Sequence, residues 1–381
     1  MNGTSALTQR QRKALVRALH KWLGKGNMSR ALRDVLPPSG LGPDERQEVA
    51  ALVHGVVRYW RWYAYVLERS AVPPTAESYM GLVAGDIDVD EEALEAALPP
   101  EKRTAIRHSF SDGMAAVIDA RFPDLAEYLD REPLKELCVN LNKVDRDGLI
   151  AGLVGEGFEA RPGALATSVI SEDNARYSKA VKEGLAHVQD GSSQFVAGRA
   201  ASLGSNILDY CAGSGGKSLA MASITKGQAR LSAYDKDAKK LDALRERAGK
   251  HGLCINVLDA APTSPSASPF DVVLVDAPCS GVGAARRNPE TKYITDLGRY
   301  PPVQSEILSQ AAGNVRPGGY LVYSVCTFLP QETEDVIARF VAAGGFSLMP
   351  PKDAGLPESG LTHMVVPGGD VLYVAVLRKD G

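Results

Sequence analysis

An alternation of short apolar runs and longer amphipathic segments in the second half of the chain constrains the fold most. Strand-like apolar runs lie at 207–210, 231–234, 254–258, 272–275 and 320–323. Helix-like segments accompany them at 217–224, 238–251, 303–314 and 332–341. This alternation predicts an α/β fold with a mostly parallel sheet and helices on both of its faces. Two later apolar runs, 364–366 and 371–377, predict an antiparallel hairpin at the end of the sheet.

The chain has 381 residues, more than one ordinary domain requires. We expect a helical domain over residues 1–130, a small αβ connector over 131–187 and the α/β domain over 188–381. No run of about 18 apolar residues is present, so no membrane span is predicted. Five cysteines without a CxxC pair argue against a disulfide framework and a zinc site, and they favour a reducing, cytoplasmic setting. We expect no metal and, by default, a monomer.

The predicted helical domain begins with apolar residues at helical spacing between 15 and 23. Asp44 is then expected to cap a second helix that ends near residue 67. Basic and aromatic residues interleave near the end of this helix, from Arg58 to Tyr63. Such a mixture suits phosphate contact and base stacking, so Arg58 and Arg61 are candidate RNA-binding residues. Packing of the aromatic rings in a small helical core is the competing interpretation.

The net charge of −3 conceals an uneven distribution. Residues 1–70 hold 12 Lys/Arg against 5 Asp/Glu, a balance of +7, whereas residues 71–135 hold 6 against 14, a balance of −8. This asymmetry indicates either a polar partner surface or a solvated helical face.

A glycine-rich loop follows the predicted strand 207–210. It consists of Cys211, Ala212, Gly213, Ser214, Gly215, Gly216 and Lys217. Glycines between a strand and a helix let a ligand approach the N-terminus of that helix. A P-loop would need glycine where Cys211 stands, and a dinucleotide fingerprint would need glycine at Ser218. An S-adenosylmethionine site is the third possibility, and the loop alone indicates it only weakly.

Aspartates at the ends of later strands strengthen the interpretation as a cofactor site. Asp235 follows one predicted strand and could bind ribose hydroxyls, while Asp259 follows the next and could contact an adenine amino group. Asp276 ends the strand 272–275. Open α/β sheets bind ligands at the carboxyl ends of their strands, where this ordered set would lie. Each aspartate taken singly could equally be a turn or helix-cap residue.

Two cysteines follow predicted strand ends. Cys279 comes just after Asp276, and Cys326 comes just after the strand 320–323. Neighbouring strands of a parallel sheet would bring these thiols together although 47 residues separate them (326 − 279). A thiolate is a strong nucleophile toward an electron-poor ring. For either cysteine alone, the simpler interpretation is a small buried apolar residue.

These residues resemble a known family. The segments 276–281, 286–290 and 323–326 are similar to motifs of the Sun/Fmu (RsmB-type) family of RNA 5-methylcytosine methyltransferases. Residues 188–194 and the glycine loop resemble the preceding motifs of that family. The segment 10–68 resembles, more weakly, part of a NusB-like RNA-binding domain. The resemblance implies a Rossmann-like class I methyltransferase domain with S-adenosylmethionine as its cofactor.

The resemblance also implies a reaction. Cys326 would add to carbon 6 of a cytosine in RNA while Asp276 hydrogen-bonds the ring at N3. Carbon 5 would then take the methyl group, and Cys279 would help to remove the carbon 5 proton and release the enzyme. Lys217 would lie near the cytosine and the cofactor, where its charge favours the electron-rich intermediate. The target base must be single-stranded or flipped out of a helix.

The RNA partner is less defined. The resemblance favours ribosomal RNA, with transfer RNA as an alternative, and it suggests that Arg286 and Arg287 hold the RNA backbone. Ser214 and Thr333 depart from the residues that the family usually has at these positions. A non-catalytic RNA-binding factor in ribosome assembly is a further alternative, against which the intact Cys279 and Cys326 count.

Overall fold

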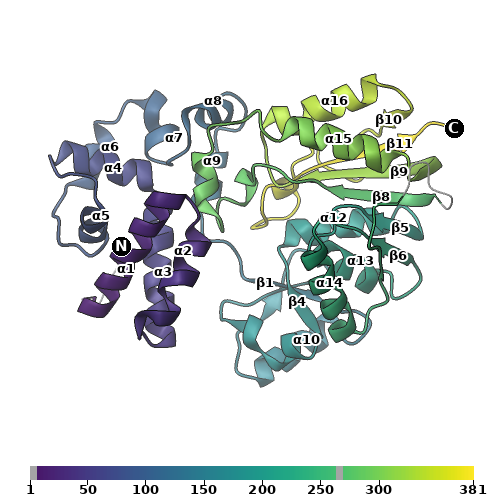
Figure 1. Ribbon diagram of the computed structural model, residues 1–381, viewed down its shortest axis with the longest axis horizontal. Helices are drawn as coiled ribbons and strands as arrows, with labels where there is room; N and C mark the ends of the chain where they lie inside the picture. Colours follow the sequence, from purple (N-terminus) through teal and green to yellow (C-terminus); the bar gives the residue numbers. More distant parts are fainter. Residues whose placement is uncertain (1–6, 263–268) are drawn as a thin grey trace. The chain divides into compact units, whose positions relative to one another are not determined.

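The chain forms two compact units in the computed structural model, which describes residues 7–262 and 269–381 (Figure 1). The helical unit comprises the chain up to Arg131 together with the later segment 284–295. The α/β unit comprises residues 132–283 and 296–381. The segment that was expected to be a connector, 131–187, therefore lies almost wholly within the α/β unit.

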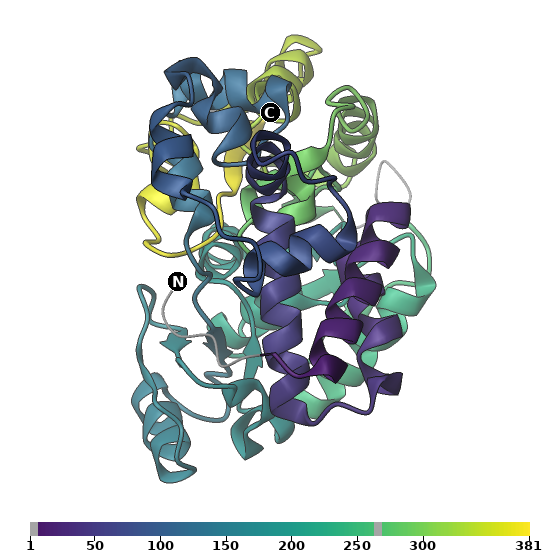
Figure 2. The ribbon, with the colours of Figure 1, turned by 90° about the vertical axis from the view of Figure 1, so that its left-hand side faces the viewer.

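Nine α-helices form the described part of the helical unit that precedes Arg131. They are α1 (Gln9–Lys25), α2 (Met28–Val35), α3 (Pro43–Arg58), α4 (Trp60–Arg69), α5 (Ala76–Val83), α6 (Glu91–Ala96), α7 (Arg103–Ile106), α8 (Asp112–Arg121) and α9 (Leu125–Asp130). Figure 2 shows α1, α2 and α3 packed beside one another. Thr8 and Gln11 form a capping box at the start of α1, and Gly26 ends the helix in the left-handed conformation.

The helix predicted to end near residue 67 is two helices in the structure. The chain turns at Tyr59, whose backbone leaves the helical region (φ −116°, ψ 28°), and α4 begins at Trp60. The predicted cap at Asp44 is wrong, because Gly42 is the N-cap and Asp44 lies in the first turn of α3. An acidic residue in the first turn still stabilises the helix through its dipole.

Aromatic side chains fill the centre of the helical unit. The ring of Trp60 contacts those of Trp22, Tyr79 and Tyr293, with centroid separations of 4.4, 5.9 and 5.9 Å. Trp62 is 1% exposed. Burial of such rings contributes a large share of the hydrophobic stabilisation of a small core. The core-packing interpretation of the aromatic cluster after Arg58 is thus confirmed for Trp62.

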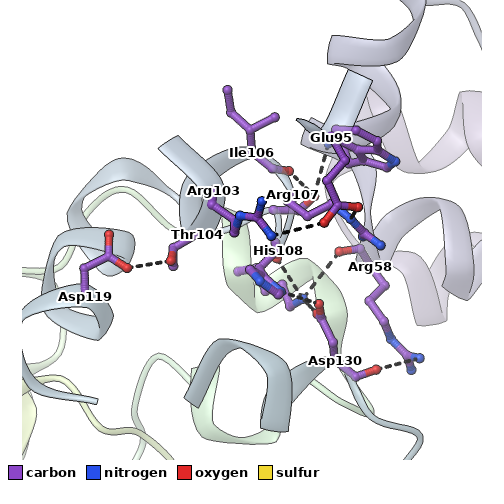
Figure 3. A network of polar contacts seen from close by, with 12 residues as sticks. Arg58, Glu95, Arg103, Thr104, Ile106, Arg107, His108, Asp119 and Asp130 are labelled. Carbon is purple, nitrogen blue, oxygen red and sulfur yellow. Dashed lines mark hydrogen bonds and ion pairs between the residues drawn. The ribbon is translucent and has the colours of Figure 1, made fainter. Parts of the chain in front are cut away.

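The segment 284–295 is held in the helical unit by buried polar contacts with residues that include Arg58 and Asp130, both labelled in Figure 3. Lys292 is fully buried, and its Nζ donates hydrogen bonds to Asp130 Oδ1 (2.5 Å) and to the carbonyl oxygen of His108 (3.0 Å). The guanidinium of Arg58 donates to the carbonyl oxygens of Arg286 (2.9 Å) and Asp130 (3.4 Å). Burial lowers the pKa of Lys292, while the charge of Asp130 and its hydrogen bond oppose that shift. Asp130 is therefore the counter-charge on which the burial of Lys292 depends.

Replacement of this counter-charge should destabilise the helical unit. We expect Asp130→Asn to lower its free energy of unfolding by about 3 kcal/mol, because the variant leaves a buried ammonium without a compensating charge. Urea denaturation followed by tryptophan fluorescence measures this, since the three tryptophans of the chain (Trp22, Trp60 and Trp62) belong to the helical unit. A double variant with Lys292→Met should recover most of the loss. Equal stability of wild type and Asp130→Asn would contradict the account.

The α/β unit is built on a seven-stranded sheet with the order β10-β11-β9-β8-β5-β6-β7. Its strands are β5 (Asn206–Asp209), β6 (Arg230–Ala233), β7 (Asn256–Val257), β8 (Phe270–Asp276), β9 (Val315–Val325), β10 (Phe346–Leu348) and β11 (Tyr373–Lys379). The pairs β6·β7, β5·β6, β5·β8 and β8·β9 are parallel. The pairs β9·β11 and β10·β11 are antiparallel. The predicted Rossmann-like class I methyltransferase fold is confirmed.

The last strand, β11, does not pair with the segment that was predicted to form a hairpin with it. The segment 364–366 does not pair with β11, because residues Thr362–Met364 form a 3₁₀ turn. β11 pairs instead with β9 and with β10, which the sequence interpretation missed. β10 is only three residues long and mixes apolar with polar residues, so its pattern is weak.

Helices cover both faces of this sheet. In Figure 1, α12 (Gly191–Ala201), α13 (Gly216–Ile224) and α14 (Ala238–His251) lie on one face. α15 (Pro301–Ala312) and α16 (Glu334–Ala342) lie on the other. The strands are buried accordingly, with Val272, Val273, Leu274 and Val275 of β8 all inaccessible to solvent. A strand buried on both faces reads as a continuous apolar run, as this one does.

A second, antiparallel sheet occupies the start of the α/β unit, with the order β2-β3-β1-β4. Its strands are β1 (Glu136–Val139), β2 (Arg161–Pro162), β3 (Ser168–Ile170) and β4 (Ala186–Val188). The helix α10 (Arg146–Gly155) and the short helix α11 (Lys179–Lys182) belong to the same region. Leu149 and Leu153 of α10 share a small hydrophobic core with Leu137 and Val139 of β1.

Candidate active site

The glycine loop connects β5 to α13 and has the backbone that a ligand-binding turn requires. Gly213 and Gly215 both have positive φ (56° and 88°), a region that other residues adopt at a cost. A Cβ atom on Gly215 would also lie 2.7 Å from the side chain of Leu244 in α14. The loop therefore presses closely against α14, and its exposed Ser214 is held there by Arg247, whose guanidinium donates to the Ser214 carbonyl oxygen (2.7 Å).

The structure places Asp235 beside this loop and Asp259 away from it. Oδ2 of Asp235 accepts a hydrogen bond from the Gly213 amide (2.9 Å), and the residue is 9% exposed. Asp259 is exposed and forms an ion pair with Arg245 of α14 (2.5 Å). Asp235 thus places a carboxylate just after β6, and its contact with a ribose stays a prediction. The predicted adenine contact of Asp259 stays a prediction.

A buried carboxyl lies at the end of β5, two residues before the loop. Asp209 is 1% exposed, and its Oδ2 accepts a hydrogen bond from the Ser218 hydroxyl (2.6 Å). Its Oδ1 has no hydrogen-bond partner among the described residues. Burial raises the pKa of Asp209 to about 7, and the negative charge of Asp276 adds to the shift while the Ser218 hydrogen bond opposes it. The sequence interpretation did not single out Asp209, although its place before the glycine loop marks the end of the strand.

Lys217 and Asp276 form a partly buried ion pair. The Nζ of Lys217 lies 2.6 Å from Oδ2 of Asp276, with the two side chains 11% and 33% exposed. Burial lowers the pKa of Lys217, but the Asp276 charge and hydrogen bond outweigh that effect and the net pKa is raised. Lys217 is therefore cationic at neutral pH, and it interacts electrostatically with Cys326.

The two cysteines meet as the strand order requires. β8 and β9 pair in parallel with Asp276 opposite Ser324, so the chain leaves both strands at the same edge of the sheet. The Sγ atoms of Cys279 and Cys326 lie 3.2 Å apart. The hydrogen bond with Cys326, followed by burial, raises the pKa of the Cys279 thiol well above its usual value. Cys279 is thus a neutral thiol in the resting protein.

Cys211, in the glycine loop, is a different kind of thiol. Burial raises its pKa, and the carboxylates of Asp209, Asp276 and Asp235 add to the shift. It contributes to the packing of the loop rather than to a reactive thiolate.

Of the four arginines predicted to bind RNA, two are buried. Arg58 and Arg286 are 6% and 2% exposed, and Figure 3 shows Arg58 directed toward Asp130. The prediction that these two side chains contact an RNA backbone is inconsistent with their burial, because such contact requires an exposed guanidinium. Arg61 and Arg287 are only partly buried. Arg61 forms an ion pair with Asp112 (2.7 Å).

The sequence interpretation also missed a buried polar pair near the thiols. Glu332 and Gln304 are both inaccessible to solvent, and they hydrogen-bond each other. The only signal in the sequence is a polar residue four positions before Leu308, on what is otherwise the apolar side of a helix.

Comparisons with known proteins identify the family of this chain. Residues 200–354 match the family described as "16S rRNA methyltransferase RsmB/F". The chain is 30% identical over 327 residues to the ribosomal RNA small subunit methyltransferase B of Sodalis glossinidius, covering 81% of this chain and 75% of that protein. The chain belongs to the RsmB/F methyltransferase family.

Other relatives differ in how much of their length is matched. The probable ribosomal RNA small subunit methyltransferase B of Bacillus subtilis is 35% identical over 221 residues, which is 55% of this chain and 49% of that protein. The chain thus matches about half the length of that relative. A crystal structure of a methyltransferase homologue from Pyrococcus horikoshii has a TM-score of 0.61 at 22% identity, over 74% of this chain and 100% of that one, and it supports the fold.

S-adenosylmethionine is the cofactor of this RsmB/F family member. The residues fit it, because a Cβ atom on Gly213 would meet nothing within 4 Å, which leaves room for a ligand before α13, and the Asp235 carboxylate stands just after the next strand. No group of three or more potential metal ligands occurs among residues 7–262 and 269–381. In the same ranges, no helix is long and apolar enough to span a membrane.

The buried Asp209 should make stability depend on pH. Its folded pKa of about 7 exceeds that of an unfolded aspartate, which is about 4. Between these values the folded state holds a proton that the unfolded state has lost, so the contribution of Asp209 to stability falls as the pH rises. It is fully present below about pH 4 and lost above about pH 7.

The variant Asp209→Asn removes this titration and keeps an oxygen for the Ser218 hydroxyl. We expect its free energy of unfolding, relative to wild type, to rise between about pH 5 and pH 7 and to level off above pH 7. Urea denaturation of both proteins at several pH values measures the difference. A difference that is constant with pH would contradict the raised pKa.

Proposed function

We propose that this protein transfers a methyl group to carbon 5 of cytosine in ribosomal RNA of the small subunit. The observation that carries the proposal is the 3.2 Å separation of the Cys279 and Cys326 thiols beside the ion pair of Lys217 and Asp276. Methylation of an oxygen or an amine needs no thiol, whereas carbon 5 must first be made electron-rich by a nucleophile. The names of the relatives support ribosomal RNA as the substrate.

Cys326 is the proposed nucleophile. Its thiolate forms a bond to carbon 6 of the cytosine. The electron pair of the 5,6 double bond then forms a 4,5 double bond, and the pair of the double bond between carbon 4 and N3 moves onto N3. Asp276 hydrogen-bonds N3 and stabilises the ring in its electron-rich form, while the Lys217 ammonium offsets the negative charge that develops. Carbon 5 now has enamine character. When bound, S-adenosylmethionine supplies the electrophilic methyl group that carbon 5 takes.

Cys279 is proposed to act in the release step. After methyl transfer, carbon 5 carries both the methyl group and a proton. The Cys279 thiolate takes that proton, the electron pair of the carbon 5–hydrogen bond restores the 5,6 double bond, and the bond between Cys326 and carbon 6 breaks as its electron pair returns to sulfur. In the resting protein the raised pKa keeps Cys279 a neutral thiol, so it does not compete with Cys326 as the nucleophile. The largest cause of that shift is the hydrogen bond with Cys326. This hydrogen bond is lost once Cys326 is bonded to carbon 6, so Cys279 can then release its proton to solvent and act as the base.

Arg61 and Arg287 are the proposed RNA contacts. Arg61 lines a pocket of about 570 Å³ in the helical unit together with Tyr65, an arrangement that suits phosphate contact beside a stacking surface. Arg287 lies in the segment 284–295, next to the buried Arg286. Arg58 and Arg286 are left out because both are buried.

Separate replacement of the two cysteines tests the division of labour. Cys326→Ala should lower methyl transfer by on the order of 10³-fold or more, because the nucleophile is lost. Cys279→Ala should instead accumulate a covalent protein–RNA adduct, because attack proceeds without release. The measurement is methyl transfer from labelled S-adenosylmethionine to small-subunit ribosomal RNA, with adducts resolved on denaturing gels.

A third cysteine provides the control. Cys254 is exposed and lies in the loop before β7, so Cys254→Ala should transfer methyl groups like wild type and trap nothing. An adduct with Cys326→Ala and none with Cys279→Ala would reverse the two roles. RNA binding without any methyl transfer by wild type would favour a non-catalytic assembly factor, and methylation of transfer RNA alone would correct the substrate.

A further inference from the structure

A buried polar pair stands behind the Cys279 loop. Glu332 ends the 3₁₀ turn Pro330–Glu332, and Gln304 lies in the first half of α15. Both residues are 0% exposed. Side chains of this kind are rarely buried unless their polar atoms have defined partners. The hydrogen-bond partners of Glu332 and Gln304 therefore indicate what the pair does.

The pair holds the backbone on both sides of Cys279. Oε2 of Glu332 accepts hydrogen bonds from the Ser280 amide (2.9 Å) and from Nε2 of Gln304 (2.9 Å). The same Nε2 of Gln304 donates to the carbonyl oxygen of Pro278 (3.0 Å). The residues before and after Cys279 are thus tied to one carboxyl group. We call Glu332 and Gln304 the Cys279 clasp.

The clasp is also tied to the strand that carries Cys326. The hydroxyl of Tyr323, in β9, donates to the carbonyl oxygen of Glu332 (2.8 Å). The Ser280 hydroxyl donates to Oγ1 of Thr327 (3.1 Å), one residue after Cys326. One buried network therefore sets the distance between the two loops that bear the thiols.

Cys326 has a second source of positioning that Cys279 lacks. Val325 pairs with Tyr373 in the antiparallel ladder of β9 and β11, so Cys326 directly follows a strand fixed on both sides. The amide of Gly283 also donates to the Cys326 carbonyl oxygen (3.0 Å). Cys279 lies three residues beyond the last residue of β8. Loss of the clasp should therefore displace Cys279 more than Cys326.

We propose that Glu332 and Gln304 are positioning residues for Cys279 and that they are required for release of the methylated RNA rather than for the attack on cytosine. This proposal rests on the function proposed above. A thiol that acts on a proton of the substrate must be held within hydrogen-bond reach of it. Without the clasp, Cys326 still attacks, but Cys279 is out of place for the next step.

The first experiment compares clasp variants with Cys279→Ala. Glu332→Ala and Gln304→Met should both accumulate the covalent protein–RNA adduct, with kcat lowered about 10-fold to 100-fold and KM for RNA little changed. Glu332→Gln should behave like wild type, because an amide oxygen still accepts from Ser280 and Gln304. Gln304→Met preserves side-chain volume, so it guards against simple loss of folding.

Two matched controls come from the exposed side of α15. Glu306 and Gln310 are exposed on the same helix as Gln304, and Gln310 Nε2 donates to Glu306 Oε1 (3.1 Å). Glu306→Ala and Gln310→Met should keep wild-type turnover and trap no adduct. Binding of S-adenosylmethionine, measured by calorimetry, should be the same in all five variants.

A second experiment reports on the clasp without any methyl transfer. Iodoacetamide alkylation, followed by peptide mass spectrometry, gives the reaction rate of each cysteine in the same sample. In Glu332→Ala and Gln304→Met the rate at Cys279 should rise several-fold relative to Cys326, while Glu332→Gln should match wild type. The exposed Cys254 checks that the reagent acts equally in every sample.

The outcomes separate this proposal from the proposed function. If Cys279→Ala traps an adduct and the clasp variants bind cofactor but trap none, the positioning role is wrong and the proposed function stands. If no protein methylates RNA yet alkylation of Cys279 rises in the clasp variants, the clasp stands as a positioning device and the proposed function fails. Unchanged alkylation at Cys279 in both variants would overturn the clasp itself.

Discussion

The parallel pairing of β8 with β9 is the constraint on which the rest of the site depends. Its register places Asp276 opposite Ser324, and β8 and β9 both end at the same edge of the sheet. Two thiols that are 47 residues apart in the sequence (326 − 279) thereby come within 3.2 Å of each other. The pairing of β5 with β8 brings the glycine loop and Lys217 to the same edge. The carboxyl edge of a parallel sheet thus assembles both the cofactor loop and the nucleophile.

Much of this site could be predicted from the sequence because its residues follow strand ends. The glycine loop, Asp276, Cys279 and Cys326 all lie within a few residues after apolar runs, and strands buried on both faces give strong runs. β10 was missed because a three-residue edge strand leaves little pattern. The clasp was missed for another reason. Glu332 and Gln304 hydrogen-bond backbone atoms that are distant in sequence, and no spacing rule reports such contacts.

The segment 284–295 shows how burial can reverse an interpretation based on charge. Its Arg286 is predicted from the sequence to contact RNA, yet Arg286 is buried, and so is Lys292 of the same segment. Lys292 is held by Asp130, a residue from the acidic part of the chain that the sequence interpretation left without a role. The acidic excess of residues 71–135 thus includes a counter-charge for the basic residues that the helical unit buries. Charge balance along the sequence reports the composition of a region, and only the fold decides which charges face solvent.

The central claim is that the methyl group is transferred to carbon 5 through an adduct at Cys326. Ribosomal RNA prepared with tritium at carbon 5 of cytosine tests it most directly, because that hydrogen must leave when carbon 5 is methylated. The account predicts that each methyl group transferred from S-adenosylmethionine releases one tritium to water, and that Cys326→Ala releases none. Methyl transfer without release of tritium would place the methyl group on another atom and contradict the account.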